Sequence, residues 1–309
     1  CWTKTPGVCV HKDDMAALLK KMGDFDTLIM AQPLYIYTVP GLVKDFMDRC
    51  LPGAQPFMVT DKEGRTTHPS RWPGAKARIV IFSVCGFPEP EHFDPLLATF
   101  QHFYRSADRV IVGQILRPAA ESLPQAKRMG KVHGLIMDAF NQAGKELVEQ
   151  GYISQAAEQE VQRPIFRDTE TFHSLANTFW RISIGYHQAK KEGADLPPFD
   201  EYLGSRPDMM LTGMAASLNP EAAGDLSAFI QFEVTDQAEG SYYLEIKETF
   251  CRCHEGRADA PDLTIRTPWE VWLAISNGEI TGQEAMMEGK YEAQGDLSLM
   301  MRMGELFGG

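Results

Sequence analysis

The chain has 309 residues, of which 44% are hydrophobic and 23% charged, and its formal net charge is −12. This composition is typical of a globular protein with room for two domains, and six cysteines are too few for a disulfide scaffold, so we expect a cytoplasmic protein with reduced thiols. No apolar run is long enough to cross a bilayer, and the excess of acidic residues after position 205 (18 Asp and Glu against 7 Lys and Arg) argues against nucleic acid as a partner.

Short apolar runs alternate with helix-length segments through the first half of the chain. The pattern predicts strands at 26–31, 77–84 and 109–115, and helices at 14–23, 41–50 and 93–106. Apolar strands separated by helices are typical of a parallel sheet that is covered on both faces. We therefore expect an α/β fold for this part of the chain.

The first predicted strand leads into an aromatic loop between two prolines, Pro33-Leu34-Tyr35-Ile36-Tyr37-Thr38-Val39-Pro40, and a helix follows. In open α/β sheets, ligands bind outside the carboxyl ends of the strands. The two tyrosines offer flat faces to a planar ring system. The alternative is that Tyr35 and Tyr37 only cap the sheet.

The second predicted strand ends in Ser83-Val84-Cys85-Gly86-Phe87, a junction of the same kind. Gly86 lets the backbone approach a ligand closely or adopt a positive φ. The alternative is a tight turn with Phe87 packed in the core.

These two junctions resemble the flavin-contacting loops of the flavodoxin-like NAD(P)H-dependent FMN reductases and iron-sulfur flavoproteins. The resemblance implies a flavodoxin-like sheet, FMN as cofactor and NAD(P)H as electron donor, with the redox chemistry carried by the flavin and no catalytic side chain. The residues that it places at the flavin are Pro33, Leu34, Tyr35, Ile36, Tyr37, Ser83, Cys85, Gly86 and Phe87.

Cys1 and Cys9 resemble the last members of the cysteine motif of the same family. The resemblance implies about 50 further residues upstream, with the first strand and the phosphate-binding loop. An iron-sulfur cluster needs four thiolates, so Cys1 and Cys9 are metal candidates only together with upstream cysteines. The alternative is that both are ordinary thiols.

Amphipathic helices are predicted at 123–151 and 168–191, and a proline-containing linker follows them. We expect a first domain over 1–195, a linker at 196–208 and a second domain over 209–309.

The second domain is predicted to mix strands and helices. Strands are expected at 227–235, 241–254, 262–266 and 290–296, and helices from Pro268 to Asn277, at 282–288 and at 297–307. This order, together with Trp269, Trp272 and the Gly295-Asp296-Leu297 turn, resembles a sterol carrier protein 2 (SCP2) domain.

The second resemblance implies an α+β shell around an apolar tunnel that holds a lipid or sterol-like ligand. Methionine suits such a cavity because its side chain adapts to varied shapes. The candidate lipid-binding residues are Phe229, Trp272, Met287, Leu297, Met300 and Phe307. The alternative is that these side chains fill a core and bind nothing.

No other motif carries chemistry. Cys251 and Cys253 share one face of a strand and His254 faces the other way, so they do not form a metal site. Cys50 and Cys85 are interpreted as buried thiols, and no Ser/His/Asp arrangement is present.

The sequence thus predicts an FMN-dependent NAD(P)H oxidoreductase fused to a lipid-binding domain, with small-molecule electron donors and acceptors. The fusion suggests an apolar acceptor such as a quinone, and the resemblance implies a homodimer. The rival interpretation is a non-enzymatic lipid carrier whose flavodoxin-like half is a dimerisation platform.

Overall fold

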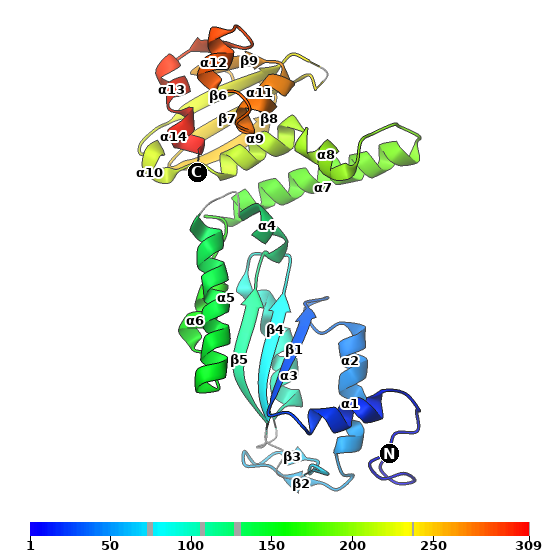
Figure 1. Cartoon of the computed structure of the whole chain (residues 1–309). Helices are drawn as coiled ribbons and strands as arrows, with labels where there is room; N and C mark the ends of the chain where they lie inside the picture. The colour runs from blue at the N-terminus through cyan, green and yellow to red at the C-terminus, as the bar shows by residue number, and fades with distance from the viewer. Residues whose placement is uncertain (73–76, 106–108, 127–130, 237, 309) are drawn as a thin grey trace. The chain divides into compact units, whose positions relative to one another are not determined.

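The computed structural model describes residues 1–72, 77–105, 109–126, 131–236 and 238–308. By its internal contacts the chain divides into two compact units, Cys1–Ile165 and Phe166–Gly309 (Figure 1). Among the described residues, no helix is both long enough and apolar enough to cross a membrane.

The elements of the first unit are, in chain order, α1 (Met15–Met22), β1 (Thr27–Pro33), α2 (Gly41–Asp48), β2 (Val59–Thr60), β3 (Thr66–Thr67), β4 (Ala77–Val84), α3 (Asp94–Phe103), β5 (Arg109–Arg117), α4 (Leu123–Ala126), α5 (Lys131–Gln150) and α6 (Gln155–Val161). Strands β1, β4 and β5 form a parallel sheet in that order, so their carboxyl ends share one edge (Figure 1).

The central strand of the first unit's sheet, β4, is covered on both faces, as predicted for a parallel sheet. In β4, Ile79 and Ile81 are fully buried against a cluster that includes side chains of α2 and α3. Val80 lies between them in sequence and packs against α5 and α6. Full burial of one such side chain stabilises the fold by roughly 1.5–3 kcal/mol. The predicted fold class is confirmed, because the near-continuous apolar run of β4 serves two cores.

The elements of the second unit are α7 (Thr169–Lys191), α8 (Phe199–Gly204), α9 (Pro207–Ala216), α10 (Pro220–Ala223), β6 (Ala228–Val234), β7 (Gly240–Lys247), β8 (Phe250–Glu255), β9 (Leu263–Thr267), α11 (Trp269–Ser276), α12 (Gly282–Met287), β10 (Glu292–Gly295), α13 (Leu297–Met301) and α14 (Met303–Phe307). The five strands form one mixed sheet in the order β10-β9-β6-β7-β8.

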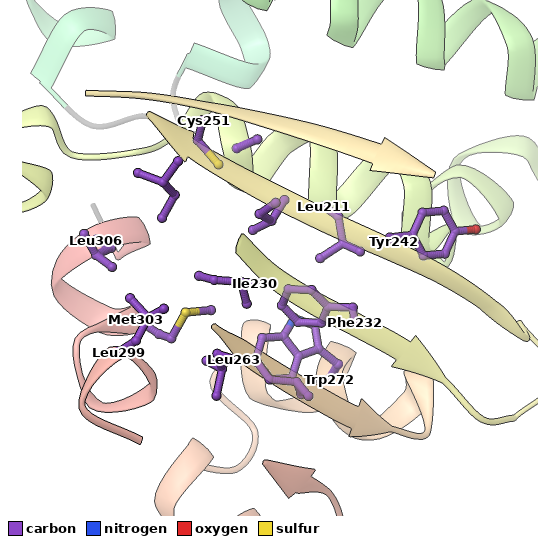
Figure 2. Close-up of a cluster of buried hydrophobic side chains, with 14 of the residues drawn as sticks. Leu211, Ile230, Phe232, Tyr242, Cys251, Leu263, Trp272, Leu299, Met303 and Leu306 are labelled. Atoms are coloured by element: carbon purple, nitrogen blue, oxygen red, sulfur yellow. The ribbon is translucent and has the colours of Figure 1, made fainter. Parts of the chain in front are cut away.

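The core of the second unit lies between this sheet and the helices (Figure 2). Phe232 and Leu263 are fully buried, and the rings of Phe232 and Trp272 meet edge to face at 5.0 Å between centroids. Such aromatic pairs contribute about 0.5–1.5 kcal/mol beyond the area that they bury. The mixed sheet and its helices confirm the predicted α+β class of this unit.

Three local predictions for the second unit are wrong. The single strand predicted at 241–254 is two strands, β7 and β8, because Glu248 and Thr249 turn the chain with φ angles of 51° and 64°. The helix predicted at 297–307 is interrupted at Arg302, whose guanidinium donates to the Ala222 carbonyl at 2.8 Å. The helix predicted to begin at Pro268 begins at Trp269, because Thr267 still belongs to β9 and Pro268 stands at the cap.

The unit border lies earlier than the predicted domain border. Helix α7, whose Asp168 cap accepts from the Thr171 N–H at 2.6 Å, packs with α8 and α9 in the second unit. The predicted first domain, residues 1–195, includes this helix, and residues 196–208 are the predicted linker. A unit defined by packing need not end where a family domain ends, so the domain borders at 195 and 209 stay a prediction.

Candidate functional site

The loop after β1 is a two-residue hairpin turn. Tyr35 and Thr38 exchange two backbone hydrogen bonds, both of 3.1 Å. The residues between them, Ile36 and Tyr37, have φ angles of 46° and 63°. Two consecutive left-handed residues are the signature of a type I′ turn, which normally uses Asn or Gly.

This turn stores backbone strain. A left-handed conformation costs of order 1–3 kcal/mol at a residue other than glycine, and a β-branched residue such as Ile36 fits it poorly. The side chains gain no burial in return, because Tyr35, Ile36 and Tyr37 are 62%, 88% and 48% exposed. Strain of this kind, uncompensated by packing, is most often retained at binding sites.

The loop after β4 is fixed from beneath by Cys85. The buried Cys85 thiol donates to the Phe87 carbonyl at 3.2 Å, and the Ala119 N–H donates to the same carbonyl at 2.7 Å. Burial raises the pKa of the Cys85 thiol, which therefore remains protonated and able to donate. Cys85 thus points inward, whereas Gly86 and Phe87 lie on the surface.

Gly86 and Phe87 leave room on the outer side of this loop. Gly86 does not adopt a positive φ, and a Cβ built on it meets no atom within 4 Å. Phe87 is 52% exposed, so the alternative that it packs in the core is wrong.

His92 links the two junctions, and sequence analysis missed it. Its ring lies 4.7 Å from the Phe87 ring and 5.7 Å from the Tyr37 ring, measured between centroids. Its Nε2 lies 3.3 Å from Glu89 Oε2. The imidazole therefore stands between an aromatic side chain of the first loop and one of the second. The Pro90–Phe93 turn that carries His92 has no motif that marks it as functional.

Two buried polar side chains lie just below the junctions. Gln32 of β1 and Ser83 of β4 face each other in the strand register, and they are 6% and 0% exposed. Neither side chain has a hydrogen-bond partner among the described residues. Buried polar groups in folded proteins almost always find a partner, so a bound molecule or water is needed here.

The junctions also present free backbone donors. In the described part of the chain, the N–H groups of Ile36, Tyr37, Gly86 and Phe87 donate to no protein acceptor. Backbone donors, flat side chains and orphaned polar groups at one sheet edge suit the heteroaromatic ring of a flavin, which has both a polar edge and apolar faces. The residues present therefore fit FMN.

A fixed positive charge lies beneath the second junction. Arg117, at the end of β5, is 1% exposed and donates to the carbonyls of Pro118, Val161 and Arg163. Its own carbonyl accepts from the Cys85 N–H at 3.1 Å. Burial lowers the pKa of Arg117 to about 10, which leaves the guanidinium charged at neutral pH.

The structure gives no support for a metal site at Cys1 and Cys9. Among the described residues, no group of three or more His, Cys, Asp or Glu side chains is arranged to hold a metal ion. This covers Cys1 and Cys9, which are both half-buried free thiols.

The lipid candidates are not brought together. Trp272 is buried in the core, where its Nε1 has no partner among the described residues, and Met300 and Phe307 are half-buried beside that core. Met287 and Leu297 are 81% and 48% exposed. Phe229 packs against Tyr243, whose neighbours in β7 face the core while Tyr243 itself faces away from it.

Comparison with known proteins finds one family match near each end of the chain. Residues 1–77 match the NADPH-dependent FMN reductase family, and residues 211–308 match the SCP-2 sterol transfer family. An iron-sulfur flavoprotein of Archaeoglobus fulgidus is 32% identical over 83 residues, which are 27% of this chain and 32% of that protein. The chain thus spans about a third of the length of the curated relative that it matches.

Among solved structures, the sterol carrier protein 2 like 2 of Aedes aegypti is 21% identical, with a TM-score of 0.27, and the match covers 34% of this chain and 89% of that one. The Trp repressor binding protein of Bacillus subtilis is 22% identical, with a TM-score of 0.25, over 33% of this chain and 61% of that one.

The family matches confirm the two predicted resemblances. An FMN reductase-like segment that contains the first junction is joined to an SCP2-like segment that contains the mixed sheet. The second junction, Ser83 to Phe87, lies outside the matched residues, so its role rests on the geometry described above.

Proposed function

We propose that the protein is an FMN-dependent NAD(P)H oxidoreductase and that the flavin binds across the carboxyl ends of β1 and β4. The observation that carries the proposal is the strained turn at Ile36 and Tyr37, which is exposed and lies within the FMN reductase match. Strained backbone conformations cluster at active sites and ligand-binding loops, which supports this interpretation of the turn.

In this proposal the chain binds and orients the flavin without a catalytic side chain. The N–H groups of Ile36, Tyr37, Gly86 and Phe87 donate to the polar edge of the ring. Tyr37, Phe87 and His92 supply its aromatic surroundings. Cys85 contacts the Phe87 loop instead of the flavin and acts as a positioning residue, and Pro33 and Leu34 hold the first loop on the sheet.

The flavin supplies the redox chemistry when it is bound, because it accepts a hydride from a nicotinamide. The chain tunes that chemistry through charge and hydrogen bonding. Arg117 contributes a buried positive charge near the site, which favours the negative charge of a reduced flavin. His92 Nε2 lies 3.3 Å from Glu89 Oε2, a contact that orients the ring between the two loops.

The proposal has two further parts, which concern the SCP2-like segment. The first is that the electron acceptor is apolar, such as a quinone. The second is that this segment binds a lipid or sterol-like molecule. The support for both parts is that one chain contains an FMN reductase-like segment and an SCP2-like segment. A homodimer that completes the flavin pocket belongs to the same proposal.

An absorption titration of the full-length protein with FMN tests the proposal. We expect a saturable shift of the flavin bands, bleaching on addition of NAD(P)H, and faster reoxidation by a quinone than by a water-soluble acceptor. Absence of binding with FMN in excess would refute the flavin site. Binding without bleaching would refute the nicotinamide as donor, and equal reoxidation rates would refute the apolar acceptor.

A further inference from the structure

Two adjoining cavities lie in the second unit, outside its apolar core. Their volumes are about 210 and 230 Å³, and they share Arg181, Asp208, Tyr242 and Glu255 as lining residues. These volumes leave room for a small polar molecule.

The four residues that both cavities share come from four elements, and together with their neighbours they form the walls of this cleft. Helix α7 contributes Asn177 and Arg181, four residues apart and therefore on one helical face. Helix α9 contributes Asp208. Tyr242 of β7 and Glu255 of β8 are direct partners across the antiparallel strands. The cleft is thus built on regular elements.

Tyr242 directs an unpartnered hydroxyl into the cleft. The side chain is 6% exposed, lines both cavities, and forms no hydrogen bond with a described residue. Figure 2 shows the hydroxyl pointing away from the other labelled core side chains. Gly240 leaves space for the ring, because a Cβ there would lie 2.9 Å from Tyr242 Cε2. The hydroxyl is not one of the fully buried unpartnered side-chain atoms of the described residues, so it is open to the cleft and can hydrogen-bond water or a ligand there.

The charges in the cleft are balanced but incompletely paired. Arg206 and Asp208 form an ion pair with a distance of 3.2 Å between Nε and Oδ1. Arg181 and Glu255, in contrast, form no ion pair with each other or with any other described residue. An anion alone would meet the two carboxylates, and a cation alone would meet the two guanidinium groups. Only a ligand with both charges satisfies both walls.

The cleft offers neither a metal site nor a reactive thiol. Cys253 also lines it, and burial raises the pKa of this thiol to about 11, so the thiol is protonated at neutral pH. No described cluster of His, Cys, Asp and Glu is arranged for a metal. Reversible binding is the chemistry that remains.

We propose that this cleft binds a small zwitterion, with its anionic oxygens at Arg181 and Asn177, its ammonium group at Glu255, and the Tyr242 hydroxyl as an additional hydrogen-bond partner. A phosphate ester that carries a primary amine has this chemistry, whether it is a free molecule or the head group of a phospholipid. The site is separate from the proposed flavin site and does not depend on it.

Calorimetric titration of the full-length protein with phosphoethanolamine tests this proposal, with inorganic phosphate and ethanolamine as single-charge probes. We expect phosphoethanolamine to bind at least about tenfold more tightly than either probe. Arg181→Gln and Glu255→Gln should each weaken binding about tenfold, and Tyr242→Phe about threefold. The matched control is Arg257→Gln, because Arg257 is 72% exposed, pairs with Glu233 and does not line the cleft.

The proposal is overturned if phosphoethanolamine gives no saturable heat, if phosphate alone binds equally well, or if Arg181→Gln behaves like the control. Circular dichroism of each variant separates loss of binding from loss of fold. Vesicles that contain phosphatidylethanolamine then distinguish the two sources. Recruitment that Arg181→Gln weakens supports a lipid head group, and binding of the soluble probe without recruitment supports a free zwitterion.

Discussion

Both units pack helices against a β-sheet, but they expose different groups of candidate binding residues. In the first unit, the central strand β4 is covered on both faces, and the loops that follow β1 and β4 are exposed. In the second unit, the candidate lipid residues are divided between a filled core and the surface. Most flavin candidates therefore lie exposed on two loops at one edge of the sheet, apart from the buried Ser83 and Cys85, whereas the lipid candidates are not brought together.

A pair of matched turns makes the comparison sharper. Ile36 and Tyr37 in the first unit, and Glu248 and Thr249 in the second, are pairs of consecutive residues with positive φ. The second pair joins β7 to β8, and its Thr249 carbonyl accepts from Arg167 at 2.6 Å, whereas the first pair stands at a proposed binding site. The same backbone conformation thus occurs once as a connection and once with exposed aromatic side chains.

The largest expected effect is the loss of a core aromatic ring in the second unit. Phe232→Ala removes a fully buried side chain that packs against Trp272, and should destabilise this unit by about 3–5 kcal/mol. Urea denaturation followed by tryptophan fluorescence measures the loss. FMN binding should be unchanged while the first unit stays folded, and a parallel loss of FMN binding would contradict the independence of the two units.

The next effect concerns the aromatic surface of the flavin site. Phe87→Ala should lower FMN affinity about tenfold, because stacking and apolar contact with the ring are lost. Stability should change little, since Phe87 is 52% exposed. Flavin fluorescence titration measures the affinity. Tyr152→Leu, at an equally exposed tyrosine of the same unit, is the control and should bind FMN normally.

Relief of backbone strain should affect FMN binding at only one of the two turns. Ile36→Asn and Glu248→Asn should each stabilise the protein by about 1 kcal/mol, because asparagine tolerates a positive φ better than the native residues. Thermal unfolding measures both changes. Only Ile36→Asn should also alter FMN affinity. If both variants bind FMN like the native protein, the turn at Ile36 and Tyr37 has no role in FMN binding.

The smallest effect is a dependence on acid. Two hydrogen bonds of 2.8 Å from Arg49 hold the pKa of Asp13 at about 2, below its ordinary value of 3.8. The stabilisation is therefore complete above pH 3.8 and is lost as the pH falls through about 2. The stability of the Asp13→Asn variant should therefore depend less on pH in this acid range, as measured by acid denaturation. The same pH dependence in the variant and the native protein would contradict this prediction.

The sequence predicted what depends on regular patterns. Strand β4 was predicted with its observed bounds, because an apolar run between turn residues has few alternatives. The division of the 241–254 strand was missed because Glu248 and Thr249 are not turn residues by composition, and only the tertiary pairing of β7 with β8 places them in a turn.

The sites were predictable to the extent that they follow strand ends. The sequence located the two strand ends whose role as a flavin site stays a prediction, but it did not indicate His92 and Gln32, because their positions depend on neighbours that are distant in sequence. A glutamine in an otherwise apolar strand was the signal that could have indicated Gln32. The zwitterion cleft had no sequence signal, since four separate elements supply its residues.

The most direct test of the central claim is an FMN titration of the full-length protein and of its Phe87→Ala variant, recorded by absorption with and without NAD(P)H. The account predicts saturable binding and bleaching by NAD(P)H in the native protein, and clearly weaker binding in the variant. No binding by the native protein, or equal binding by the two, would contradict a flavin site formed by the ends of β1 and β4.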